Sequence, residues 1–425
     1  MDVQQIRQLK PMLRRYLSEF DDCFARKDTR AHLSKYVEGQ LSDLERKSVE
    51  PMALKVGVPV RTLQEFLSQH RWDNDRMRDQ LHEIVVRDHA GPHSIGIIDE
   101  TSFVKKGEKT PGVQRQHCGA VGKQENCIVT VHLGYAVDDF HCLLDGDLFL
   151  PESWSNDRVR CREARIPDEV VYRPKSEIAL ELYDRATANG VTFEWLTFDE
   201  WYGVKPQFLR ALDGRGQKFV GEVHKHYSAW IDPPRTTERP YRRGGRGRGK
   251  KIPRLVSRSR PPQHVEDLLA YHPALRDQAW QKWRVKDGEK GPMIWEVKHT
   301  LIHPKNENGL PDKPYHLIVA RNVLHPDEIK YFISNAPLET KVPTLLLVAF
   351  SRWRIERCFE DQKGEVGLDH YEGRRWLGLQ RHLAITAVSY LFLARAREKF
   401  RGGKPATHLM PSAHGNGCRG EVLVA

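Results

Sequence analysis

The sequence predicts an α/β protein with a helical N-terminal part, and three observations lead to this fold class. Residues 1–90 have apolar side chains at helical spacing. From Ser94 onward, short apolar strand-like runs alternate with helical segments, which is typical of an α/β core. Between residues 227 and 335 this alternation stops and the recognisable pieces are strand-like. We therefore expect a core in two parts, residues 91–226 and 336–400, separated by a β-rich insertion.

Length and composition narrow the class of protein. The 425 residues exceed a usual single domain, so several domains are expected. The longest mostly apolar runs, Thr344–Phe350 and Leu383–Ala394, are shorter than the roughly 18 residues needed to cross a bilayer. Seven cysteines without a C-x-x-C pair argue against a disulfide framework or a zinc knuckle. We expect a cytoplasmic, reduced protein with no signal peptide and no membrane partner.

The helical part contains a candidate helix-turn-helix. Ala53 and Gly57 lie four residues apart and are followed by Val58-Pro59. Thr62-Leu63-Gln64-Glu65 is a capping-box pattern, which predicts the start of a new helix. A helix, a turn glycine and a newly capped helix are typical of DNA-binding domains, although any helical hairpin has the same pattern. Gly91-Pro92 is expected to end this part of the chain.

The elements of the core follow from apolar runs and turn residues. Strands are expected at Ser94–Ile98, at Cys127–Val137 and His141–Leu144 on either side of Asp138-Asp139, at Val191–Phe198 and at Lys218–Val223. Pro174–Asn189 is expected to be a helix, because it has proline at its start and Gly190 as its stop. Later in the chain we expect Thr344–Phe350 as a buried strand, Ser351–Lys363 as a helix and Leu377–Phe400 as a long helix.

The positive charge is concentrated in one segment. Arg235–Arg260 contains eleven basic residues and one acidic residue, which accounts for almost all of the formal net charge of +11. Its glycines and few apolar groups mean that it cannot bury a core of its own. It suits a nucleic-acid backbone, because each neutralised phosphate releases counterions, but a solvated loop without a partner has the same composition. The candidate DNA-binding residues within it are Arg242, Arg243, Arg246, Arg248, Lys250 and Lys251.

Two apolar strand-like runs each end on an aspartate. Asp99 follows Ile95–Ile98, and Asp199 follows Glu194–Phe198. In open α/β sheets, ligands and catalytic groups gather at the carboxyl ends of strands. An aspartate at such a place needs an ionic partner, a helix to cap or a cation. Capping of the next turn remains the alternative interpretation for each of them.

The helix predicted after the last strand carries a second group of charged residues. Arg352, Glu356 and Lys363 lie at positions i, i+4 and i+11, which places them on one helix face. The alternative is an exposed stripe in which Arg352 and Glu356 form an ordinary ion pair. A site for two divalent cations needs about three carboxylates, and cationic groups must hold the phosphate being cut. Together with Asp99 and Asp199, this helix supplies those residue types.

At these residues the sequence resembles the DDE transposases of bacterial insertion sequences. The string from Arg352 to Lys363 is similar to the R-x3-E-x6-K part of that family's signature. Further similar segments are Gly367–Arg374, Asp99–Thr101 followed by Lys105–Gly107, and, most specific of all, Gly112–Gln116 with Gly119, Gly122-Lys123 and Asn126-Cys127. The resemblance covers roughly residues 30–400.

The resemblance implies an RNase H-like catalytic core interrupted by a β-rich insertion. It implies that Asp99, Asp199 and Glu356 hold two Mg²⁺ ions, with Mn²⁺ as a substitute, and that Arg352 and Lys363 hold DNA phosphate. The expected activity is Mg²⁺-dependent cleavage at the ends of an insertion sequence followed by strand transfer. The expected partners are double-stranded DNA, as terminal inverted repeats and target, and a second copy of the chain. The expected location is the bacterial cytoplasm, at the nucleoid.

The sequence departs from the family pattern at two positions. Ala349 stands where the signature begins with tyrosine, which concerns an auxiliary phosphate contact. Glu200 stands where a small residue usually follows the second aspartate, which indicates a local charge difference. Residues 401–425 lack periodicity and differ from the family's usual C-terminus, so a disordered tail or a truncated reading frame is expected there.

Other chemistries receive less support from the sequence. No H-E-x-x-H, G-x-S-x-G or Walker motif occurs, which argues against zinc hydrolases, acyl hydrolases and P-loop NTPases. The remaining alternative is a DNA-binding regulator, or a domesticated relative, that keeps the fold without cutting DNA. The three carboxylates Asp99, Asp199 and Glu356 argue against it, whereas Ala349 and the unusual C-terminal residues favour it.

Overall fold

The computed structural model describes residues 3–239, 251–288, 291–400 and 410–411. The chain divides into two compact units. The first unit contains residues 1–221 and 351–405, and the second contains residues 222–350 and 406–425. Both units contain strands and helices, so the predicted mixed α/β character is confirmed. No helix in the described ranges is long and apolar enough to cross a membrane.

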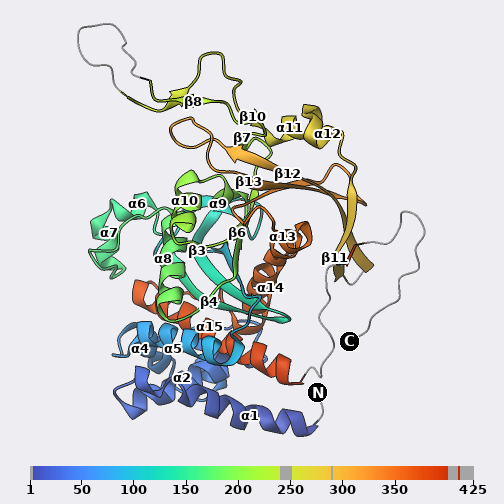
Figure 1. Ribbon diagram of the computed structural model, residues 1–425. Helices are drawn as coiled ribbons and strands as arrows, with labels where there is room; N and C mark the ends of the chain where they lie inside the picture. Colours follow the sequence, from blue (N-terminus) through green and yellow to red (C-terminus); the bar gives the residue numbers. More distant parts are fainter. Residues whose placement is uncertain (1–2, 240–250, 289–290, 401–409, 412–425) are drawn as a thin grey trace. The chain divides into compact units, whose positions relative to one another are not determined.

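The first unit is built on a mixed sheet (Figure 1). Its strands, in spatial order, are β2 (Gln114–Cys118), β3 (Lys123–Val137), β1 (Ile95–Val104), β5 (Trp195–Phe198) and β6 (Phe219–Val223), and β4 (Phe140–Leu148) also pairs with β3. β1 runs antiparallel to β3 and parallel to β5, and β5 runs parallel to β6. The predicted turn at Asp138-Asp139 joins β3 to β4 and is confirmed, with Asp138 in the left-handed region at φ 47°.

Strand β1 is longer than predicted. We expected it to end before Asp99, but it continues to Val104. Its parallel partner β5 ends at Phe198, whereas its antiparallel partner β3 continues as far as the pair Val104 and Cys127. The polar residues after Ile98 therefore stay in the sheet, because β3 still satisfies the backbone hydrogen bonds of β1 there.

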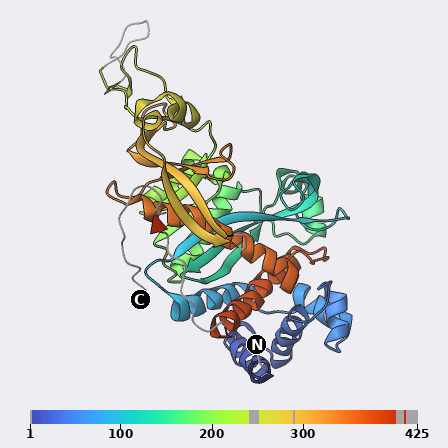
Figure 2. The same cartoon turned by 90° about the vertical axis from the view of Figure 1, so that its right-hand side faces the viewer.

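The first unit has many helices around this sheet. They are α1 (Val3–Ser18), α2 (Lys27–Gln40), α3 (Val49–Lys55), α4 (Val60–Ser68), α5 (Asn74–His89), α6 (Glu152–Ser155), α7 (Arg158–Glu163), α8 (Lys175–Ala188), α9 (Glu200–Gly203), α10 (Pro206–Gly214), α14 (Trp353–Asp361) and α15 (Trp376–Phe400), with short turns η1 (Asp21–Cys23), η2 (Phe350–Arg352) and η3 (Gln362–Val366). The predicted long helices at α8 and α15 are confirmed. Helix α15 is buried over most of its length because it contacts β4 on one side and α1, α2, α4 and α5 on the other (Figures 1 and 2).

The predicted helix pair in the N-terminal part is present as α3 and α4. Gly57 lies in the turn between them at φ +70°, a conformation that glycine adopts at little cost. The second helix begins at Val60, not at the predicted capping box. Pro59 is the N-cap of this helix, with φ −58° and ψ 136°. Glu65 instead forms an ion pair with Arg61, four residues earlier.

The run Thr344–Phe350 is helical, which corrects the predicted strand. It belongs to helix α13 (Val342–Ala349), which has Pro343 in its first turn. Periodicity cannot separate a short buried helix from a buried strand, because both appear as a continuous apolar run. Three consecutive leucines are good helix formers, and proline is well tolerated at the start of a helix. The predicted helix that follows is also divided, into η2, α14 and a π-helical turn at η3.

The second unit is rich in antiparallel strands. They are β7 (Ser228–Trp230), β10 (Gln263–His264), β11 (Gln281–Gly288), β12 (Gly291–Pro304), β13 (Tyr315–Asn322) and β14 (Ile329–Ser334), with the short strands β8 (Thr236–Thr237), β9 (Arg254–Leu255) and β15 (Met410–Pro411) and the helices α11 (Val265–Tyr271), α12 (Pro273–Arg276) and α13. The spatial order is β10, β7, β12, β13 and β14, and β11 also pairs with β12. The strand-like pieces expected between 227 and 335 correspond to these strands.

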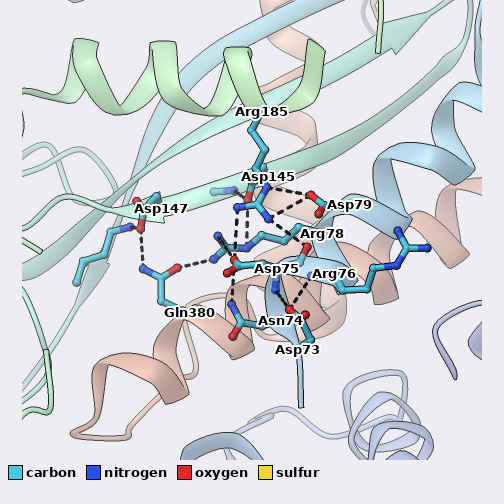
Figure 3. Close-up of polar contacts among 12 residues, drawn as sticks. Asp73, Asn74, Asp75, Arg76, Arg78, Asp79, Asp145, Asp147, Arg185 and Gln380 are labelled. Carbon is cyan, nitrogen blue, oxygen red and sulfur yellow. Dashed lines mark hydrogen bonds and ion pairs between the residues drawn. The ribbon is translucent and has the colours of Figure 1, made fainter. Parts of the chain in front are cut away.

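A buried polar network connects α5 with the core of the first unit (Figure 3). Arg78 of α5 lies 3.4 Å from the carboxylate of Asp145 on β4, whose side chain is 2% exposed. Gln380 of α15 accepts a hydrogen bond from Arg78 at 2.5 Å and donates one to Asp147 at 2.6 Å. Arg185 of α8 lies 3.9 Å from Asp145. Since buried charges need partners, this network fixes α5 against the sheet.

Candidate active site

Two parallel strands bring Asp99 and Asp199 together. Ile98 of β1 lies opposite Phe198, the last residue of β5, and an aspartate follows each of them: Asp99 within β1, and Asp199 directly after β5. Adjacent strands are about 4.8 Å apart. Asp199 also caps helix α9, because its carboxylate accepts hydrogen bonds from the backbone N–H groups of Trp201 and Tyr202 at 3.1 and 3.4 Å. The capping interpretation of Asp199 is therefore confirmed, and it is compatible with a role in a site.

Glu356 of helix α14 is the third predicted carboxylate, and Arg352 connects it to Asp99. The guanidinium of Arg352 donates to Asp99 Oδ2 at 2.9 Å and lies 2.9 Å from Glu356 Oε1. The i, i+4 ion pair of Arg352 and Glu356 is present, as the alternative interpretation of an exposed, ion-paired stripe predicted. However, the same guanidinium also reaches a buried carboxylate on β1, which a simple surface pair would not do. Arg352 thus links two of the three predicted carboxylates.

Packing explains why α14 lies over this part of the sheet. Asp99 is directly opposite His132 of β3, so both side chains are on the same face. Phe359 of α14 contacts the His132 ring at a centroid distance of 5.2 Å. Ile355 lies so close to Gly134 that a Cβ there would be 3.3 Å away. The apolar face of α14 therefore covers β3, and its polar N-terminal turn reaches Asp99.

The surroundings of Asp99 and Asp199 raise the pKa of both carboxyl groups. Burial raises the pKa of Asp99 to about 7, the guanidinium of Arg352 opposes this rise, and the carboxylates of Asp199 and Glu356 add to it. Burial also raises the pKa of Asp199 above its ordinary value, again against the effect of Arg352. Carboxyl groups that lose hydration and face like charges become hard to ionise, unless a cation compensates. Perturbed carboxyl groups of this kind are characteristic of functional sites.

Sequence reasoning missed a polar group on the opposite face of β1. Lys175, at the start of α8, contacts Glu100 Oε1 at 2.7 Å. Within the described residues, Glu100 Oε2 and the hydroxyl of Tyr202 are buried without a hydrogen-bond partner. The negative charges of Glu100, Asp99 and Asp199 raise the pKa of Tyr202 further above the rise that burial causes. The adjacency of Glu100 to Asp99 was the only sequence signal for this group.

Lys363 lies farther along β1 than the two aspartates. Its ammonium group is 5.8 Å from the centroid of the Phe103 ring. Phe103 is four residues beyond Asp99 on the same strand, which corresponds to about 13 Å. Burial lowers the pKa of Lys363. The structure thus brings Arg352 to Asp99, whereas Lys363 lies beside the second half of β1.

Most of the predicted basic DNA-binding residues cannot be placed. Arg242, Arg243, Arg246, Arg248 and Lys250 lie outside the described residues. Lys251 is described and exposed, and it belongs to the second unit. The C-terminal segment 401–425 is also outside the described residues, except for positions 410 and 411.

The residues present fit a hard divalent cation by their chemistry. Asp99, Asp199 and Glu356 offer carboxylate oxygens, the donors that Mg²⁺ prefers. Among the described residues, no group of three or more His, Cys, Asp or Glu side chains is close enough to hold a metal ion as it stands. Arg352 lies between Asp99 and Glu356. A cation that used both carboxylates would therefore have to replace the guanidinium there.

Comparison with known proteins identifies the family. Residues 19–292, more than half of the chain, match the family model of the DDE superfamily endonucleases. The chain belongs to this family. The match with the DDE superfamily includes Asp99 and Asp199 and ends before Glu356. The resemblance to DDE enzymes inferred from the sequence motifs is therefore confirmed at the level of the family.

This chain is also similar to a protein encoded by an insertion sequence. It is the probable transposase for insertion sequence element IS701 of Microchaete diplosiphon, which is 31% identical over 197 residues. The alignment covers 46% of this chain and 49% of that protein. The chain thus matches about half the length of this relative.

Proposed function

We propose that this chain is a transposase that cuts DNA at the ends of an insertion sequence and joins them to target DNA. The observation that carries the proposal is the parallel pairing of β1 with β5. It puts Asp99 and Asp199 side by side, and Arg352 connects Asp99 to Glu356. The family match and the similarity to a probable insertion-sequence transposase support the same function. The sheet of the first unit serves as an RNase H-like core in this proposal, and the strands of the second unit form its insertion.

The three carboxylates would hold two Mg²⁺ ions, which Mn²⁺ can replace. When bound, such ions activate the attacking oxygen and stabilise the leaving oxygen of an in-line displacement at phosphorus. Asp99 and Asp199 contribute fixed ligands, since the sheet and the start of α9 hold them. Glu356 is 51% exposed, so it can adjust its position as DNA enters.

The basic residues would hold the DNA phosphates. Arg352 compensates the carboxylates in the free protein and turns its guanidinium toward a backbone phosphate beside the cut, for which its planar fork is suited. Lys363 contacts a phosphate farther along the same strand, consistent with its place beside Phe103. The basic segment Arg235–Arg260 adds sequence-independent affinity. The α3–α4 hairpin reads the terminal inverted repeats, and two copies of the chain act on the two element ends.

Cleavage of a supercoiled plasmid that carries the element ends tests this function. We expect nicking in Mg²⁺ and none in EDTA. Asp99→Ala, Asp199→Ala and Glu356→Ala should each abolish cleavage and leave DNA binding largely intact, because carboxylates hold metal ions and repel phosphate. Glu360→Ala is the matched control on α14, since this glutamate is 71% exposed and pairs with Arg357.

Two results would contradict the proposal. Wild-type cleavage in any one of the three alanine variants would remove that residue from the site. DNA binding by the wild-type chain without any Mg²⁺-dependent cleavage would favour the alternative, a DNA-binding regulator that keeps the fold without cutting.

A further inference from the structure

A polar cleft lies on the first unit, and none of the proposed catalytic residues lines it. Its volume is about 660 Å³. Four segments converge on it: residues 108–115 with the start of β2, Asn126 of β3, the region of α6 and α7, and the loop before α15. They contribute the basic side chains of Lys109, Arg115, Arg160 and Arg374. Glu108 and Glu163 are the acidic residues of its lining.

The floor of this cleft is tightly built. Trp154 is 1% exposed, and its indole N–H donates to the carbonyl of Val113 at 2.7 Å. The guanidinium of Arg160 lies 3.8 Å from the centroid of the Trp154 ring and donates to the carbonyl of Glu108 at 2.8 Å. Arg160 therefore fixes the loop before β2 against α7, and a cation–π contact of this kind adds stability.

A motif from the sequence forms one wall of the cleft. Gly112–Gln116 is the segment most specifically similar to DDE transposases, and the proposed catalytic steps assign it no role. Gly112 adopts φ +79°, and a Cβ there would be 3.0 Å from Leu148. Only glycine fits this close turn without strain. The turn leads directly into β2, so it determines where Arg115 lies at the cleft.

The lining of the cleft has a net positive charge, because its four basic residues outnumber its two acidic residues. Lys109, Arg115 and Arg374, the rim residues, are exposed, and none of them forms an ion pair with another described residue. Basic side chains without acidic partners create a positive potential that attracts polyanions. The apolar groups of Trp154 and Val113 are buried beneath the rim. A small apolar ligand would therefore gain little in this cleft, whereas phosphate groups would find several charged donors.

We propose that this cleft is a docking surface for the phosphate backbone of double-stranded DNA. This inference rests on the proposed function and adds a binding surface that is separate, in its residues, from Asp99, Asp199 and Glu356. Arg115 and Arg374 contact backbone phosphates through their planar guanidinium groups, and Lys109 contacts one as a point charge. Arg160 keeps the floor in place and is a positioning residue.

The salt dependence of DNA binding tests this proposal. The variant Lys109→Gln/Arg115→Gln/Arg374→Gln removes three rim charges without touching the floor. The matched control is Arg7→Gln/Lys10→Gln/Arg14→Gln, which removes two arginines and one lysine from exposed positions of α1. Both variants have the same net charge. The logarithm of the binding constant is measured against the logarithm of the salt concentration, with duplex DNA and the full chain in EDTA, so that no cleavage intervenes.

We expect the slope to fall in magnitude by up to about 2.7 in the rim variant, since each lost phosphate contact removes about 0.9. The control should keep the wild-type slope. An unchanged slope in the rim variant, or equal changes in both variants, would overturn the proposal, because the effect would then be absent or would depend only on net charge. Thermal melting of both variants verifies that they are folded.

Cleavage by the same variants separates this proposal from the proposed function. At saturating DNA and low salt, the rim variant should still cut DNA in Mg²⁺, because its carboxylates are intact, whereas Asp99→Ala should not cut. A reduced salt slope in the rim variant, combined with no Mg²⁺-dependent cleavage by the wild-type chain, would support the docking surface and contradict the proposed transposase. Cleavage by the wild-type chain with an unchanged salt slope in the rim variant would support the proposed transposase and contradict the docking surface.

Discussion

Asp99 is buried, lies near other carboxylates and is paired with the guanidinium of Arg352. An aspartate in an unfolded chain titrates near 3.9, whereas burial raises the pKa of Asp99 in the folded protein to about 7. Between about pH 4 and pH 7 the folded state binds more protons than the unfolded state, so its free energy of unfolding falls as the pH rises. Asp99 thus stabilises the protein most at low pH and loses this contribution as it ionises.

This titration predicts a pH-dependent effect of Asp99→Asn. The asparagine cannot ionise, so the variant avoids the cost of a buried charge at high pH. Relative to the wild type, we expect its free energy of unfolding to be higher at pH 8 than at pH 5 by about 2–3 kcal/mol. Chemical denaturation at the two pH values, without divalent cations, measures this difference. The same difference between variant and wild type at both pH values would contradict the raised pKa.

At the scale of elements, the pairing of β1 with β5 sets the distance between the two aspartates. Gly96 of β1 faces Leu196 and Phe193, and a Cβ at this position would be 2.3 Å from Leu196 Cδ2 and 2.8 Å from Phe193 Cδ1. The absent side chain thus allows close packing three residues before Asp99. Any larger residue must displace β1 or the side chains of its neighbours.

We therefore predict that Gly96→Ala lowers both stability and cleavage. Overpacking of a tight core typically costs about 1–3 kcal/mol, and a shift of β1 moves Asp99 relative to Asp199. Gly214→Ala, at the end of α10, is the control because a Cβ there has nothing within 4 Å. Denaturation midpoints and single-turnover cleavage at saturating DNA measure the two effects. Wild-type stability and cleavage in Gly96→Ala would show that the strand pair tolerates the change.

At the scale of the whole molecule, the network around Asp145 connects α5 to the sheet of the first unit. The side chain of Asp145 is 2% exposed and that of Arg78 is 10% exposed. Removal of one partner of a buried pair leaves the other charge uncompensated, which costs about 3–5 kcal/mol. We expect Arg78→Met to cause a loss of this size, and Asp145→Asn in the same chain to restore part of it.

A double-mutant cycle measured by chemical denaturation tests this coupling. Arg76→Met is the control on the same helix, because Arg76 is 34% exposed and pairs with Glu83, which is 49% exposed. Exposed pairs contribute about 1 kcal/mol or less. If Arg78→Met and Arg76→Met cost the same, the network would not hold α5 to the core.

Local patterns predicted several elements because their cause is local. The long helix Trp376–Phe400 contains an extended apolar run that is buried from Gly378 to Phe392, and Lys175–Ala188 has proline before it and glycine after it. The β3–β4 hairpin follows from a polar turn between two apolar runs. The run Thr344–Phe350 was predicted wrongly, because a short apolar stretch has the same appearance in a buried strand and in a buried helix.

Motifs in the sequence were enough to identify the family and the types of residue in the candidate site. The motifs at Asp99–Thr101, Gly112–Gln116 and Arg352–Lys363 resemble those of DDE transposases, and the family model confirms the superfamily. The same residues include the carboxylates and cations that chemistry on phosphates needs.

How these residues meet depends on the fold. It placed Arg352 between Asp99 and Glu356, and it put Lys363 beside Phe103. It also joined four segments into the basic cleft and three helices with one strand into the network around Asp145. These contacts depend on strand pairing and core packing between residues as many as 302 positions apart, as for Arg78 and Gln380. Spacing along the chain carries no information about such distances, because they are set by which apolar surfaces cover one another.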